Sequence, residues 1–279
     1  MAKSKNRPFM EVKSTEIDKK KGMKHPENYA HVMVATPAYN GQVDSDYSQS
    51  LAEAAQLATV FGIRFTASVM GNGAFIDLAR NTFVRFFLEE HTDCTHLFFV
   101  DADLKFEPRA FVELIRHCTK DRPVLAGAYR RRQEPEDYPI MWAPLETDDD
   151  YEGPDRLWLN DEGWLQCNRV ATGFLCIHRS VVEEMAAEAD MIHLHNQAPI
   201  PKLFYTYIDD EGKFIGEDFA WCDDYVKKYG KKIEVWPDFN FTHGGLKGNY
   251  QVWLSRQVKK FDYEQKHPRK KLGDKRRAG

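Results

Sequence analysis

The chain has 279 residues, of which 42% are hydrophobic and 13% aromatic, enough for one substantial α/β core without requiring a second. Its charged fraction of 29% and formal net charge of −4 are typical of a soluble protein. No run approaches the roughly 18 apolar residues of a membrane span, and the lysine-rich start has no apolar signal segment. Five scattered cysteines without a C-x-x-C pair argue against a disulfide frame or zinc knuckle. We therefore expect a cytoplasmic protein without a membrane span.

The first half of the chain alternates strand-like and helix-like segments. The pattern predicts a strand at 31–41 broken at Pro37 and Gly41, a helix at 48–63, a strand at 63–69, a helix at 71–90, a buried strand at 95–100, a helix at 108–118 and a strand at 123–131. This β-α-β-α-β-α-β order predicts a parallel sheet covered by helices.

The second half is less regular. Segment 134–163 has eleven acidic residues and only one basic residue, an arginine. It also has four prolines, and the composition indicates an insertion or a loop with a hairpin. Beyond it we expect a strand at 164–178, helices at 179–189 and 216–230, and a strand at 231–237. One domain at 29–250 is predicted, with polar basic extensions at 1–28 and 251–279. Such extensions can hold a polyanion, or they can be solvated tails.

Two aspartates follow the apolar strand in "HLFFVDADLKFEP" at 96–108. In extended geometry Asp101 and Asp103 point to the same face, and Ala102 is small enough for ligands to approach. They lie at a strand's carboxyl end, where open α/β sheets bind ligands. Two carboxylates so close repel, and a bound Mg²⁺ or Mn²⁺ removes that conflict. The alternative is a helix-capping aspartate followed by a surface aspartate.

The segment 96–108 resembles the D-x-D segment of GT-A type glycosyltransferases. The resemblance extends in order to "VMVATPAYNG", "IDLARNTFVRFFLEE", "ATGFLCIHR" and "GEDFAWCDDYVKKYGKKIEVWPDFNFTHGG", between positions 32 and 245. It implies a GT-A fold, that is, a Rossmann-like and mostly parallel α/β sheet flanked by helices, in a single catalytic domain. Small stand-alone enzymes of this kind occur in tailed bacteriophages.

The family implies a metal-dependent transfer of a sugar from a nucleotide-diphosphate donor, expected here to be a UDP-sugar. By similarity, Asp101 and Asp103 hold Mn²⁺ or Mg²⁺ against the diphosphate, and His243 in "FTHGG" is the third ligand. The metal neutralises charge on the departing nucleoside diphosphate. A histidine satisfied by structural hydrogen bonds is the alternative for His243.

Ten further residues are predicted to contact the donor. Tyr39 would stack on the base, Arg80 would reach the diphosphate as a charge-assisted fork, and Thr172 would face the sugar. The complete set is Thr36, Pro37, Ala38, Tyr39, Asp77, Arg80, Asn81, Ala102, Thr172 and Gly173. Tyr39 could instead cover the core, Asp77 and Arg80 could form a surface pair, and Gly173 could mark a bulge.

The segment "GEDFAWCDD" places Glu217 and Asp218 at the start of a helix. In inverting relatives an acidic residue in this segment deprotonates the acceptor hydroxyl, so Asp218 is the predicted base and Glu217 its alternate. Acidic residues are also common in first helical turns because the helix dipole favours them. In a retaining enzyme neither residue need be a base.

Two other classes of function remain open: a metal-dependent nucleotidyl or phosphoryl transferase, and a non-catalytic binding module. The chain has no G-x-x-x-x-G-K-[ST] loop and no obvious third carboxylate beside the pair. For the acceptor, the basic ends and Arg130, Arg131 and Arg132 favour hydroxymethylated pyrimidine bases in DNA. A glycan, lipid-linked or protein acceptor fits the core equally well, and the acidic 134–163 segment counts against a uniform DNA-binding face.

Overall fold

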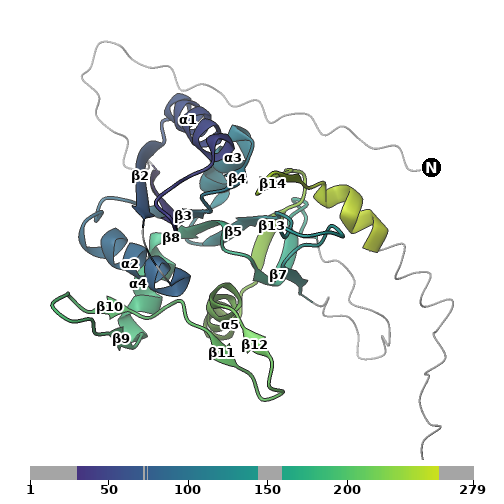
Figure 1. The fold of residues 1–279 in the computed structure, drawn as a ribbon. Helices are drawn as coiled ribbons and strands as arrows, with labels where there is room; N and C mark the ends of the chain where they lie inside the picture. Colours follow the sequence, from purple (N-terminus) through teal and green to yellow (C-terminus); the bar gives the residue numbers. More distant parts are fainter. Residues whose placement is uncertain (1–29, 72, 74, 144–158, 258–279) are drawn as a thin grey trace, which may run out of the picture.

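The computed structural model describes residues 30–71, 73, 75–143 and 159–257 (Figure 1). The predicted extension 1–28, the middle of the predicted acidic insertion (144–158) and positions 258–279 lie outside the described residues.

The central element is an eight-stranded sheet with the order β2-β1-β3-β8-β5-β13-β7-β6 (Figure 1). Its strands are β1 (His31–Ala38), β2 (Arg64–Gly71), β3 (His96–Val100), β5 (Val124–Gly127), β6 (Ile140–Trp142), β7 (Leu165–Val170), β8 (Phe174–His178) and β13 (Ile233–Trp236). Strands β7 and β8 run against the other six. The predicted α/β class, with a mostly parallel sheet flanked by helices, is confirmed.

Helices cover both faces of this sheet: α1 (Ser45–Val60), α2 (Ile76–Glu89), α3 (Pro108–His117), α4 (Arg179–Glu188), α5 (Glu217–Tyr229), and a last helix that includes 250–257. Helices α1 and α3 pack on one face, and α2, α4 and α5 on the other (Figure 1). Alternate residues of each central strand supply the two cores, as the two-residue period of a strand requires. No described helix combines the length and the apolar character needed to cross a bilayer.

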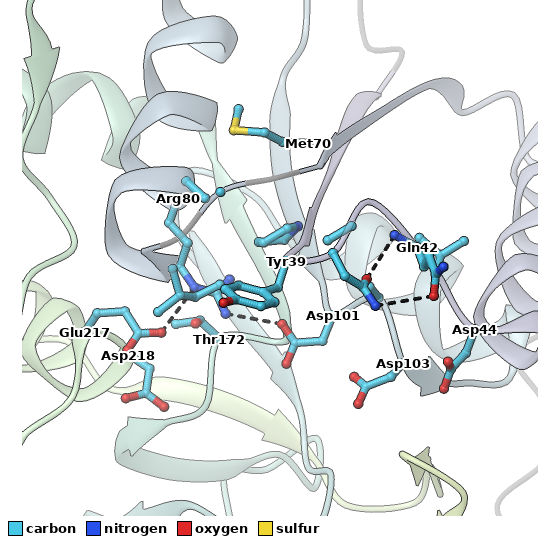
Figure 2. A pocket seen from close by; sticks show the side chains of 18 of the residues that line it. Tyr39, Gln42, Asp44, Met70, Arg80, Asp101, Asp103, Thr172, Glu217 and Asp218 are labelled. Carbon is cyan, nitrogen blue, oxygen red and sulfur yellow. Dashed lines mark hydrogen bonds and ion pairs between the residues drawn. The ribbon is translucent and has the colours of Figure 1, made fainter. Parts of the chain in front are cut away.

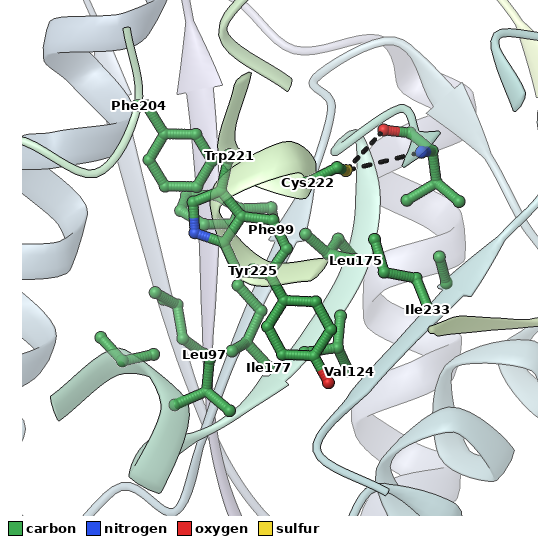
Figure 3. Close-up of a cluster of buried hydrophobic side chains, with 14 of the residues drawn as sticks. Leu97, Phe99, Val124, Leu175, Ile177, Phe204, Trp221, Cys222, Tyr225 and Ile233 are labelled. Carbon is green, nitrogen blue, oxygen red and sulfur yellow. Dashed lines mark hydrogen bonds between the residues drawn. The ribbon is translucent and has the colours of Figure 1, made fainter. Parts of the chain in front are cut away.

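Aromatic packing fixes the position of α5. Trp221 and Tyr225, four residues apart on that helix, lie stacked with ring centroids 5.6 Å apart, and Phe204 stacks on Trp221 at 5.9 Å. Figure 3 shows these rings against Leu97 and Leu175 of the sheet. This contact holds the first turn of α5 at the edge where β3 ends.

Short strands that the sequence pattern did not predict complete the fold. Strands β4 (Leu104–Lys105), β14 (Thr242–His243) and β15 (Leu246–Lys247) form a three-stranded sheet, while β9 (Met191–Ile192) pairs with β10 (Ile200–Pro201) and β11 (Tyr207–Ile208) with β12 (Phe214–Ile215). The pairing of His243 with Leu104 brings "FTHGG" beside the two aspartates.

One expectation about the elements is wrong, and two further features were not predicted. The strand predicted at 164–178 is two strands, β7 and β8, which β5 and β13 separate in the sheet. Strand β8 lies antiparallel between β3 and β5, so the early strands are not all neighbours in one parallel run. The flanks of the predicted insertion and the predicted tail also reach the core, because Tyr138 and Trp253 are buried against each other.

Candidate active site

One cavity of about 740 Å³ opens at the carboxyl ends of β1 and β3 (Figure 2). It extends from the loop between β1 and α1 to the first turn of α5. The predicted site residues that line it are Pro37, Ala38, Tyr39, Arg80, Asp101, Ala102, Asp103, Thr172, Glu217 and Asp218. Five predicted residues lie outside this lining: Thr36, Asp77, Asn81, Gly173 and His243.

The two aspartates share the cavity, but not for the predicted reason. The Leu104 N–H donates to the Asp101 carbonyl oxygen at 3.2 Å, so residues 101–104 form a turn and not an extended strand. Both carboxylates still line the same cavity (Figure 2).

Arg80 is the buried cation of the site, only 3% exposed. Its Nη2 lies 3.2 Å from Asp101 Oδ1 and its Nε lies 3.5 Å from Glu217 Oε1. Burial acts to lower the pKa of Arg80, but the charges of Asp101 and Glu217 outweigh burial and raise it. Two of its three nitrogens are therefore committed to carboxylates, which departs from the predicted open fork. Its Nη1 has no hydrogen-bond partner among the described residues.

Hydrogen bonds with Tyr129 and Gly173 hold Asp101 in place. The Tyr129 hydroxyl donates to Asp101 Oδ2 at 3.2 Å and accepts from the Gly173 N–H at 2.9 Å. The Asp101 N–H in turn donates to the Gly173 carbonyl oxygen at 2.9 Å. Burial raises the pKa of Tyr129 well above its ordinary value, so the hydroxyl keeps its proton. Gly173 thus positions a cavity residue and does not itself line the cavity.

Asp103 lies between two basic side chains. Arg132 Nη1 is 2.7 Å from Asp103 Oδ2, and His243 Nε2 is 3.4 Å from Asp103 Oδ1. Burial acts to raise the pKa of Asp103, but contact with His243 and the charge of Arg132 outweigh it and lower that pKa. Neither Asp103 Oδ2 nor His243 Nε2 has a partner with hydrogen-bond geometry among the described residues. The 2.7 Å contact of Arg132 is therefore an ion pair only.

The orientation of His243 is set by the backbone. Its Nδ1 lies 2.8 Å from the Arg130 carbonyl oxygen, which can only accept a hydrogen bond. Nδ1 therefore carries a proton, and Nε2 faces Asp103. Burial acts to lower the pKa of His243, but its contacts with Asp103 and with the Arg130 carbonyl oxygen outweigh burial and raise that pKa. A carbonyl in this role is a common outer partner of metal-binding histidines.

Asp218 is a partly buried carboxyl group at the start of α5. Burial, and then the charge of neighbouring Glu217, raise its pKa to about 6. A carboxyl group with this pKa is largely ionised at neutral pH and is a stronger base than an ordinary aspartate. Glu217 is held by Arg80, so Asp218 is the freer of the two.

Three residues predicted to contact the donor form hydrogen bonds within the protein. The Asn81 amide donates to the Phe204 carbonyl oxygen at 2.7 Å and accepts from the N–H groups of Leu203 and Phe204 at 2.8 Å, so it clamps a loop. The Thr36 hydroxyl lies 2.5 Å from that of buried Tyr47. Asp77 accepts from the Leu78 N–H at 2.8 Å. Arg80 pairs with Asp101 and Glu217, so the alternative of an Asp77–Arg80 surface pair is not what the described residues form.

The sequence reasoning missed several cavity residues. Tyr129 and Arg132 lie beyond β5 in "AGAYRRR", and Gln42 and Asp44 lie in the loop after β1. The run of polar residues directly after two strand ends was the available signal, because such ends meet at one edge of a sheet.

The three predicted metal ligands are not tightly gathered in this structure. Among the described residues, the group with three ligand atoms within 4.8 Å of one another is His31, Asp93 and Cys94, at the opposite end of β1. Both ring nitrogens of His31 are already engaged, by Asp93 at 3.1 Å and by Thr66 at 2.8 Å. Burial raises the pKa of Cys94 to about 11, so the thiolate needed for a metal ligand is scarce there.

The three consecutive arginines do not form a free basic patch. Arg130 is buried, and its guanidinium donates to the carbonyl oxygens of Lys247 and Gln133 and to Glu134. Arg131 pairs with Asp137 at 3.1 Å, and Arg132 pairs with Asp103. The prediction that Arg130 contacts DNA is wrong, because its side chain is inside the protein.

Comparison with known proteins gives only loose likenesses. No protein-family model and no curated protein matches the chain. A protein from STIV aligns with a TM-score of 0.47 and 15% identity over 77% of this chain and 85% of its own. Apo UDP-glucose pyrophosphorylase gives 0.43 and 9% over 84% and 99%. A glycosyltransferase involved in the glycosylation of the major capsid of PBCV-1 gives 0.29 and 7% over 56% and 63%. At these values the likenesses assign no function.

Proposed function

We propose that the protein is a metal-dependent glycosyltransferase that moves a sugar from a nucleotide-diphosphate donor, with a UDP-sugar as the expected donor, to a hydroxyl group. The observation that carries this proposal is the set of acidic side chains that line a single cavity. It brings the paired carboxylates of Asp101 and Asp103 together with a partly buried carboxyl group of raised pKa, Asp218. The first two suit a cation, and the third suits a base.

The residues present fit a divalent cation. Asp101, Asp103 and His243 offer two carboxylates and one imidazole, a donor set that suits Mn²⁺ or Mg²⁺. The fit is supported by two buried polar atoms that lack hydrogen bonds in the described part of the chain, Asp103 Oδ2 and His243 Nε2. When bound, the cation would offset the charge of the departing nucleoside diphosphate.

The cavity wall offers separate places for the parts of the donor. Tyr39, 76% exposed at the mouth, presents a ring on which a base can stack, with Pro37 and Ala38 beside it. Deeper in the cavity, buried Thr172 has a hydroxyl without a partner among the described residues. A sugar hydroxyl is a suitable partner for it, because a buried polar atom left unpaired is destabilising.

We infer that Asp218 takes the proton from the acceptor hydroxyl. In that role it must be ionised, so kcat/KM is expected to rise with pH through a midpoint near 6, the pKa of Asp218. Asp218→Asn should lower kcat roughly a hundredfold to ten-thousandfold and abolish this limb of the pH profile. Asp224→Asn is the matched control, because Asp224 lies on the same helix but accepts a hydrogen bond from Tyr205. It should keep the wild-type kcat and the wild-type pH profile. An unchanged kcat in Asp218→Asn would exclude Asp218 as the base.

The same substitution should stabilise the protein. Between the ordinary pKa of 3.8 and about 6, the folded protein holds a proton on Asp218 that the unfolded chain releases. Stability from this group therefore falls as the pH rises through that window, and the loss persists at pH 7. Asp218→Asn is expected to gain about 1–2 kcal/mol at pH 7 in urea unfolding, and nothing at pH 3.5.

For the acceptor, we keep hydroxymethylated bases in DNA as the proposal, with a glycan, lipid-linked or protein hydroxyl as the alternative outcomes. Its remaining support is the basic composition of the two chain ends, since Arg130 is buried. A cytoplasmic setting is proposed with it, supported by five cysteines that are all buried free thiols.

Product mass spectrometry tests the function directly. The protein is offered a panel of UDP-sugars with Mn²⁺ and acceptors that include duplex DNA containing hydroxymethylated pyrimidines. A hexose or pentose added to one acceptor, and lost in Asp103→Ala, is the expected result. Release of pyrophosphate when a nucleoside triphosphate and a sugar phosphate are offered, without sugar transfer, would instead indicate a nucleotidyltransferase.

A further inference from the structure

Of the two arginines that line the cavity in the described part of the chain, Arg132 is the exposed one. Its guanidinium contacts Asp103, a predicted metal ligand. Its side chain is 63% exposed, whereas that of Asp103 is 19% exposed. Their 2.7 Å contact has no hydrogen-bond geometry, so the guanidinium and the carboxylate are held by charge alone. Ion pairs between fully exposed side chains contribute at most about 1 kcal/mol. Here the arginine is exposed and only the carboxylate is largely buried, so the guanidinium is free to change partners.

The backbone beside Arg132 nevertheless accommodates its side chain in this position. Gly244 has φ of +53°, which favours glycine, and a Cβ there would lie 2.5 Å from Arg132 Cδ, so the stem of Arg132 in this position uses the space that glycine leaves. The Gly244 N–H also donates to the Asp103 carbonyl oxygen at 3.0 Å. The glycine after His243 therefore holds both members of the pair in place.

The loop that carries Arg132 is anchored from below. Arg130 donates to the Lys247 carbonyl oxygen at 3.1 Å and to Glu134 at 2.9 Å, and the Arg130 carbonyl oxygen orients His243. One loop thus places the Arg132 guanidinium against Asp103 and orients His243 so that its Nε2 lies beside the same carboxylate. A cation and this guanidinium would compete for the same carboxylate.

Resting on the proposed function, we propose that Arg132 is an exchangeable counter-ion. It neutralises Asp103 while no metal is bound, leaves Asp103 when the metal binds, and then pairs with the donor diphosphate. A guanidinium and a divalent cation on one carboxylate repel each other, so binding of one favours release of the other. The released group stays at the cavity wall, and its planar fork matches a phosphate. Arg80 is less suited to this role, because Asp101 and Glu217 occupy two of its nitrogens.

The test is metal binding without nucleotide, followed by nucleotide binding with saturating metal. Free Mn²⁺ is measured by electron paramagnetic resonance and UDP binding by calorimetry, both on the full chain. Arg132→Gln is compared with Arg131→Gln, which makes the same change in net charge one residue away, at a side chain paired with Asp137. Arg132→Gln is expected to bind Mn²⁺ alone roughly threefold to tenfold more tightly than Arg131→Gln. It is expected to bind UDP roughly tenfold more weakly at saturating Mn²⁺.

The two affinities test the two parts of the proposal separately. Equal Mn²⁺ affinity in the two variants would overturn the counter-ion role, and equal UDP affinity would overturn the pairing with the diphosphate. If the wild-type protein binds neither Mn²⁺ nor UDP, the proposed function itself fails and this inference fails with it. Because Arg132 is an exposed side chain, the thermal unfolding of both variants should match that of the wild type, which excludes misfolding as the cause of a difference.

Discussion

Replacing Arg80 with methionine is expected to lower the free energy of unfolding by about 3 kcal/mol, because it removes a buried cation that pairs with two carboxylates of the cavity at once. Asp101 and Glu217 lie on either side of the guanidinium, and Asp218 is close enough for its charge to affect Arg80. Without Arg80, these acids would repel one another in a partly desolvated cavity. Urea unfolding at pH 7 measures the effect.

Two comparisons make the Arg80 experiment specific. Arg64→Met removes a half-exposed arginine paired with Asp93 and should cost less than about 1 kcal/mol. Adding Glu217→Gln to Arg80→Met should recover at least about 1 kcal/mol, because it removes one of the stranded charges. A loss no larger than that of Arg64→Met would mean that Arg80 is not the electrostatic centre of the site.

Adding a single methyl group at Gly173 is expected to disable the site. A Cβ at this position would lie 2.0 Å from Asp101 Oδ2 and 2.3 Å from the Tyr129 hydroxyl oxygen, far inside contact distance. The Asp101 carboxylate must therefore move, and its hydrogen bond from Tyr129 must break. Gly173→Ala is expected to weaken UDP binding in the presence of Mn²⁺ by more than about tenfold and to destabilise the fold by about 1–3 kcal/mol.

Tyr129→Phe separates the two parts of this effect. It removes the hydroxyl that donates to Asp101 at 3.2 Å but adds no atom. We expect it to weaken UDP binding less than Gly173→Ala does, since the carboxylate loses one donor and keeps its place. Calorimetry of UDP binding, with thermal unfolding alongside, checks the pair. Wild-type UDP affinity in Gly173→Ala would contradict the view that the exact place of Asp101 matters.

The elements of the core could be predicted because their patterns are local. The run 96–100 is apolar on both faces, as a strand with helices above and below must be, and the helix at 108–117 begins at Pro108 as expected. The order of strands could not be predicted in the same way. Nothing local in 164–178 says that β8 inserts between β3 and β5 while β7 pairs with β13.

The residues of the candidate site likewise divide into those with a local sequence signal and those without one. Tyr39, Asp101, Asp103, Glu217 and Asp218 follow strand ends or begin a helix, Arg80 lies in the second turn of α2, and the structure brings all of them to one cavity. The sequence assigns no role to Tyr129 and only a contact with DNA to Arg132, because their partners are distant in the sequence. The partners of Tyr129, for example, lie 28 and 44 residues away along the chain. Asn81 shows the opposite error, since a polar residue next to Arg80 turned inward to hold a loop.

The central claim is that a cation on the aspartates of the 101–104 turn is needed to bind the nucleotide diphosphate. Calorimetric titration of UDP, with Mn²⁺ and again with a chelator, tests it most directly, in the wild type and in Asp103→Asn. We expect binding to require Mn²⁺ and to weaken by more than about tenfold in Asp103→Asn. Equal UDP affinity with and without the metal would contradict the account.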